Sequence, residues 1–80
     1  MEGHAIKVTF SNGQEFIYER VTMRKGEKIL VLKNVDDTDK KVYRSKRDVL
    51  NNVRCLRREF DDMATFEIIA SCGREVQKLR

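Results

Sequence analysis

The chain has 80 residues, of which 40% are hydrophobic and 38% are charged, and its formal net charge is +4. This is enough apolar material for one small core, so we expect a single domain over residues 1–80 and not a disordered chain. No apolar run approaches the length of about 18 residues that a membrane-spanning helix needs. The first ten residues lack the basic and apolar regions of a secretory leader, so we expect a cytoplasmic protein without membrane partners.

Residues 4–10 alternate apolar with polar side chains, which predicts a half-buried strand. Asn12 and Gly13 then indicate a turn into a second β-rich segment at 14–23. A two-residue loop would put Phe16 on the face opposite Phe10. A three-residue loop over 11–13, with Gly13 in the left-handed region, puts the large apolar side chains of both strands on one face. We prefer the second register, because a buried face determines strand pairing.

Residues 28–35 (KILVLKNV) predict a third strand that is apolar on both faces at its centre. We therefore place this strand in the middle of the sheet. The acidic stretch from 36 to 39 lacks the glycine and glutamate of an EF-hand loop, which favours a solvated turn over a calcium site. Residues 41–44 (KVYR) predict a short fourth strand.

A helix is predicted for residues 46–60. Ser45 and Asp48 approximate a capping box at its start. Its apolar residues recur at helical spacing and form one stripe, which consists of Val49, Val53, Leu56 and Phe60. The competing interpretation is a short 3₁₀ segment followed by the last strand of an SH3-like small β-barrel, because Asn51 and Asn52 have low helix propensity.

Residues 64–71 (ATFEIIAS) predict a C-terminal strand. The expected fold is therefore α+β: a small antiparallel meander of three or four strands, one amphipathic helix and a C-terminal strand. An SH3-like barrel is the alternative. The predicted core consists of Ile6, Val8, Phe10, Phe16, Tyr18, Val31, Val49, Val53, Leu56, Phe60, Phe66 and Ile68.

The positive charge is concentrated in one segment. Residues 40–58 hold eight basic residues and a single acidic one, Asp48. On a helix, Arg47, Asn51, Arg54 and Arg58 would lie opposite the apolar stripe. Guanidinium groups bind phosphate or guanine and asparagine can bind adenine, so we predict nucleic-acid binding, with DNA as the expected ligand. The candidate binding residues are Lys40, Lys41, Arg44, Lys46, Arg47, Asn51, Arg54, Arg57 and Arg58.

Catalytic and metal sites are not indicated. The chain has no phosphate-binding glycine loop and no hydrolase or zinc-protease motif, so we expect neither an enzyme nor a cofactor. The only histidine, His4, does not make a zinc site with two distant cysteines. We expect Cys55 and Cys72 to be reduced and mostly buried.

Residues 6–21 (IKVTFSNGQEFIYERV) contain V-T-F-x-N-G followed by a second strand that ends in valine. This segment resembles the start of small β-rich accessory proteins encoded by phages and prophages of Gram-positive bacteria. The resemblance implies an accessory or inhibitor protein that binds an acidic host or defence protein, and for such a partner Tyr43 is a candidate aromatic anchor. A homodimer is a further alternative, because it would account for the two-faced third strand and would leave the basic segments paired about a two-fold axis.

Overall fold

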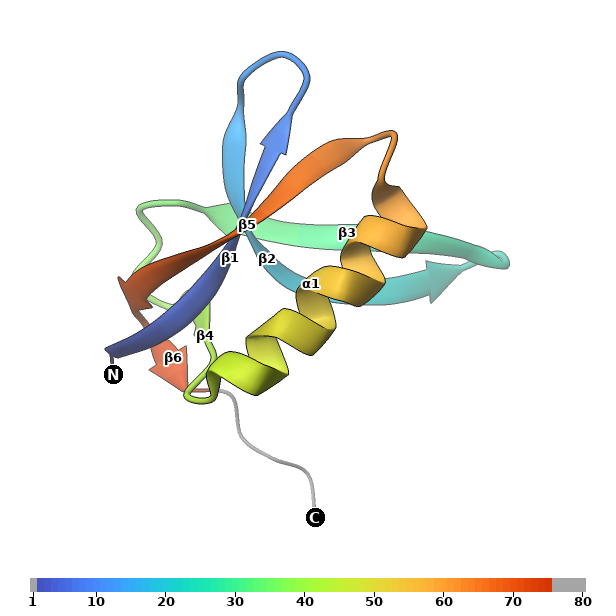
Figure 1. The fold of residues 1–80 in the computed structure, drawn as a ribbon. Coiled ribbons are helices and arrows are strands. Elements are labelled where there is room, and N and C mark those ends of the chain that lie inside the picture. The colour runs from blue at the N-terminus through green and yellow to red at the C-terminus, as the bar shows by residue number, and fades with distance from the viewer. Residues whose placement is uncertain (1, 76–80) are drawn as a thin grey trace.

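The computed structural model describes residues 2–75 as an open antiparallel sheet with one helix packed on it (Figure 1). The sheet has four strands in the order β3-β2-β1-β5. The elements are β1 (Glu2–Phe10), β2 (Glu15–Arg24), β3 (Glu27–Asn34), β4 (Lys41–Val42), α1 (Lys46–Phe60), β5 (Ala64–Cys72) and β6 (Arg74–Glu75). The α+β prediction and the helix over 46–60 are confirmed, and the barrel alternative is wrong because the sheet does not close.

The first hairpin has the register that the buried face predicts. Val8 lies opposite Phe16. The backbone N–H of Phe10 donates to the carbonyl oxygen of Gln14 at 2.9 Å, which leaves a three-residue loop. Gly13 closes this loop with φ 88°, a conformation that glycine adopts without steric cost. The rings of Phe10 and Phe16 then meet edge to face at 5.7 Å.

The third strand is at the edge of the sheet, so its predicted central position is wrong. β5 pairs with β1 along its whole length and takes the place beside it. A β-bulge at Glu19 interrupts the pairing of β2 with β3. β1 pairs with β2 only as far as residues 15–17. Beyond the bulge, among the described residues, β2 has β3 as its only strand partner. These residues, 20–31, form a two-stranded arm that we call the β2–β3 ribbon, visible at the right of Figure 1.

The segment after β3 lies next to β1 and β2. Tyr43 exchanges two backbone hydrogen bonds with His4, at 2.9 and 2.7 Å. The predicted strand at 41–44 is thus present as β4, whose formal strand is only two residues long. β4 also pairs in parallel with β6, which makes a second, small sheet.

The helix packs on β1 and β5 and its apolar stripe closes the core. Most predicted core residues are buried, whereas Phe10, Phe16, Val31 and Ile68 are only partly buried. The prediction missed Ala5, Ile17, Val42, Tyr43 and Ala64, which are all buried. Ala5 and Ile17 belong to the opposite face of the sheet, because side chains alternate along a strand. That second buried face exists because the segment around β4 packs beside β1 and β2.

Candidate nucleic-acid interface

The outer side of α1 carries an uninterrupted row of polar side chains. The inner stripe is buried, and the residues about 160° around the helix from it are exposed. These outer residues are Arg47, Asn51, Arg54 and Arg58, which we call the arginine row. Among the described residues, none of them has a hydrogen-bond or ion-pair partner. Arg58 is eleven positions after Arg47, so the row extends about 16 Å along the helix.

The remaining five candidate residues differ in their exposure and contacts. Arg44 and Lys46 are exposed at the start of the helix. Three others make internal contacts. The Lys40 ammonium donates to the carbonyl oxygen of Val35 at 3.0 Å, and Arg57 Nη2 donates to the carbonyl oxygen of Phe66 at 3.0 Å. The third, Lys41, packs on aromatic rings. Of the nine predicted binding residues, Lys40, Lys41 and Arg57 are thus engaged in contacts within the fold, and the exposed cations are centred on α1.

Lys41 lies over two tyrosines. Its ammonium is 5.5 Å from the ring centroid of Tyr18 and 5.4 Å from that of Tyr43. A cation at this distance from an aromatic face is stabilised by the ring quadrupole. Tyr43 itself is only 5% exposed, so its predicted role as an aromatic anchor for a partner is wrong. Burial raises the pKa of both phenols above their ordinary value.

The two flanks of α1 differ in charge. Lys46, Leu50 and Arg57 follow one another on the flank beside β5, as the Arg57–Phe66 hydrogen bond shows. The carboxylates of Asp48 and Glu59 are on the other flank, toward the β2–β3 ribbon. Glu59 pairs there with Lys28 of β3 at 2.7 Å. The arginine row and the β5-side flank thus form one basic surface without a helical carboxylate in it.

The start of α1 lacks the predicted capping box. Ser45 is the N-cap residue, with φ −92° and ψ 127°, but its side chain makes no capping hydrogen bond. Asn52 Nδ2 instead donates to the carbonyl oxygen of Asp48 at 2.8 Å. This hydrogen bond joins the Asn52 side chain to the preceding turn of α1, an interaction that the low helix propensity of asparagine does not indicate.

Both cysteines are exposed, so their predicted burial is wrong. At about 100° per residue, Cys55 lies about 130° around the helix from the centre of the buried stripe. Cys72 is the last residue of β5. Neither thiol is paired in a disulfide.

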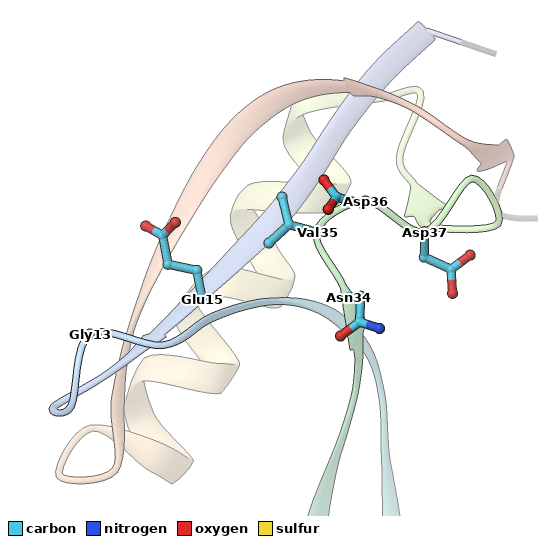
Figure 2. Close-up of a pocket in the computed structure, with 6 residues that line it drawn as sticks. All are labelled: Gly13, Glu15, Asn34, Val35, Asp36 and Asp37. Atoms are coloured by element: carbon cyan, nitrogen blue, oxygen red, sulfur yellow. The ribbon is translucent and has the colours of Figure 1, made fainter.

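A shallow acidic hollow lies between the first hairpin and the loop after β3, and sequence analysis did not predict it. Figure 2 shows its lining, with Asp37 pointing away from Glu15. The lining residues are Gly13, Glu15, Asn34, Val35, Asp36 and Asp37. The carboxylates do not converge, and within residues 2–75 no group of three or more His, Cys, Asp or Glu side chains could hold a metal ion. Only proximity in the folded chain brings Glu15 near the 34–37 loop.

No family model, curated protein or solved structure matches this chain. Among the described residues, no helix has the length and apolar character needed to cross a membrane.

Proposed function

We propose that this protein is a non-catalytic DNA-binding protein whose arginine row contacts the nucleic acid. The observation that carries the proposal is that Arg47, Arg54 and Arg58 are exposed on one side of one helix and that no side chain among residues 2–75 pairs with them. Unpaired guanidinium groups keep their full capacity to bind phosphates in a bidentate manner. The absence of helical carboxylates from this surface removes the competition that would weaken such contacts.

The shape of the surface favours duplex DNA. An α-helix with side chains is about 10–12 Å across, and the major groove of B-DNA is about 12 Å wide. α1 packs on β1 and β5, and its outer side carries the exposed arginine row, so this side of the helix is the one that would face a groove. Asn51, in the middle of the row, would contact a base edge while the arginines contact phosphates. The major groove of duplex RNA is too narrow and deep for this arrangement.

Fluorescence anisotropy with labelled duplex DNA, duplex RNA and single-stranded DNA tests the proposal. The test variant is Arg47→Glu/Arg54→Glu/Arg58→Glu. The matched control is Arg20→Glu/Arg24→Glu/Lys25→Glu, which makes the same change in net charge on the exposed β2–β3 ribbon. We expect the test variant to lose duplex DNA binding and the control to retain it. Equal weakening of both variants, or no binding by the wild type, would contradict the proposal.

Salt dependence gives an independent readout. Three arginine–phosphate contacts predict a slope of log affinity against log salt of about −2.7, or about fortyfold weaker binding when salt rises fourfold. A slope near zero would show that the row does not neutralise phosphates.

The exposure of Leu50 favours a second candidate, an acidic protein partner. Leu50 is 39% exposed on the β5-side flank, between Lys46 and Arg57. An apolar side chain bordered by cations suits a protein interface better than a phosphate backbone. The resemblance of residues 6–21 to phage accessory proteins supports the same candidate. Leu50→Ala separates the two proposals, because it should leave DNA affinity unchanged and weaken binding to an acidic protein surface.

A further inference from the structure

The outer edge of β3 has backbone groups that no strand within the described residues pairs with. Lys25 and Gly26 form a two-residue turn with φ values of 51° and 80°, which makes Arg24 and Glu27 a hydrogen-bonded pair. Hydrogen bonding alternates along an antiparallel strand. Residues 27, 29 and 31 therefore direct their backbone groups toward β2, and residues 28, 30 and 32 direct theirs outward. Among residues 2–75, no strand pairs with this outer edge.

The side chains of β3 do not protect this edge. Ile29 is 37% exposed and Val31 is half-buried on the face away from the helix. Lysines commonly shield strand edges from further pairing. Here Lys28 is held by Glu59 at 2.7 Å and Lys33 is held by Asp39 at 2.9 Å. In addition, a two-stranded ribbon is marginal by itself and gains stability from a further strand.

We propose that β3 pairs antiparallel with β3 of a second copy of this chain, about a two-fold axis at Leu30. Residues that lie opposite each other in an antiparallel pair point to the same face of the sheet, and the faces alternate along each strand. A two-fold axis perpendicular to the sheet must therefore pass through the position of one residue and not between two neighbouring residues. Centred on Leu30, this register places Ile29 opposite Val31 of the second copy. It also places Glu27 opposite Lys33 of the second copy, twice by symmetry.

Charge selects this register over its neighbour. With the axis at Val31, Ile29 would lie opposite Lys33 of the second copy and Glu27 opposite Val35. Both pairings set a charge against an apolar side chain, whereas opposite charges across strands are stabilising. With the axis at Leu30, residues 28, 30 and 32 supply about six hydrogen bonds across the axis.

Lys33 can hold two carboxylates at once, as a lysine elsewhere on the sheet does. The Lys7 ammonium is 3.2 Å from Glu15 and 3.3 Å from Glu67, which come from the strands on either side of it. In the dimer, Lys33 would keep Asp39 and gain Glu27 of the second copy. Lys7 therefore provides a precedent within this fold for the proposed ion pairs.

The other edge of the sheet suits self-pairing less well. At β5, Arg57 of α1 already donates to the Phe66 carbonyl oxygen. Glu67 is the only charged side chain of that strand, so no antiparallel self-pairing of β5 gives a complementary charge pair. The β3 dimer would also place both copies of α1 on the same side of the joined sheet. The dimer does not depend on nucleic-acid binding.

Charge exchange tests both the dimer and its register. The full chain, Glu27→Lys, Lys33→Glu and an equimolar mixture of the two variants are compared by sedimentation equilibrium and native mass spectrometry. Each variant alone sets like charges opposite each other twice, so we expect its self-association to weaken roughly tenfold. In the mixture both pairs are again complementary, so heterodimers should form with wild-type affinity. Lys25→Glu and Asp62→Lys are charge controls that should dimerise as the wild type does.

Each outcome is informative. A wild type that stays monomeric at high concentration, variants that dimerise normally, or a mixture without enriched heterodimers would each overturn the proposal. Circular dichroism establishes that the variants are folded. If Lys33→Glu unfolds through loss of its ion pair with Asp39, Ile29→Lys provides the test and Met23→Lys, at a 60% exposed position on β2, is its control. Dimerisation that survives Ile29→Lys would overturn the proposal.

Discussion

Gly3 lies so close to Val42 that a Cβ atom at residue 3 would be 2.5 Å from Val42 Cγ1 and 2.6 Å from the Tyr43 carbonyl oxygen. Real Cβ atoms do not approach other atoms this closely. The close contact at Gly3 allows the segment around β4 to lie against β1. In this position Val42 is buried, and the backbone of Tyr43 pairs with that of His4. Gly73 contacts the same segment, because a Cβ there would collide with the Lys40 carbonyl oxygen.

Gly3→Ala should therefore lower the free energy of unfolding by about 1–3 kcal/mol, since the added methyl group must displace backbone. Gly13→Ala is the control: its Cβ would meet nothing within 4 Å, so only the strain of φ 88° remains, at about 1 kcal/mol. Urea denaturation of the two variants measures the difference. A smaller loss for Gly3→Ala than for Gly13→Ala would show that β4 does not pack as described.

Two leucines of α1 should differ sharply in how much they contribute to stability. Leu56 is buried in the core and Leu50 is exposed on the β5-side flank. Leu56→Ala leaves a cavity and should cost about 2–5 kcal/mol, whereas Leu50→Ala should change stability by about 0.5 kcal/mol or less. Thermal unfolding followed by circular dichroism compares them. Similar costs at the two positions would contradict the orientation of the helix.

The Tyr43 hydroxyl is buried without a hydrogen-bond partner among the described residues. Removing an unsatisfied polar group from a core relieves its desolvation penalty. We therefore expect Tyr43→Phe to be neutral or to stabilise the protein by about 1 kcal/mol. Tyr43→Ala, which removes the ring, should cost about 3–5 kcal/mol. Chemical denaturation of both variants tests this, and a loss of more than about 1 kcal/mol in Tyr43→Phe would reveal a partner for the hydroxyl.

Stability should decline at high pH. Burial is the main cause that raises the pKa of Tyr43 and of Tyr18, so the folded state disfavours both phenolates. In the unfolded chain these tyrosines ionise near pH ~10. The stability that the two neutral tyrosines contribute to the folded state is therefore fully present below about pH 9, and it is lost as the pH rises above about 10. The measurement is the free energy of unfolding across this range, and Tyr43→Phe should show a shallower decline. Identical slopes in the two proteins would exclude Tyr43 as a source.

Local patterns predicted the elements whose determinants are close together in the chain. The three-residue loop at 11–13 followed from the need to put Val8 and Phe16 on one face. The limits of α1 followed from four apolar residues at helical spacing, and the arginine row followed from the same periodicity. The sequence also showed that residues 40–58 are basic, but it did not show which of their side chains form hydrogen bonds within the fold. Arg57 and Lys40 bond to carbonyl oxygens that only the folded chain brings near them.

The sequence by itself determined β1 to β5, the helix and its two faces, because these depend on periodicities of two and about 3.6 residues over short windows. Only the tertiary structure decided the order of the strands. The bulge at Glu19 bends β2 away from β1. The places beside β1 are then taken by β5 and by the segment around β4, and β3 is left at the edge of the sheet. The apolar faces of β3 are equally compatible with a central strand, so pairing between residues far apart in the sequence made the choice. The same long-range packing buried Tyr43 and left the edge at which we propose a second copy binds.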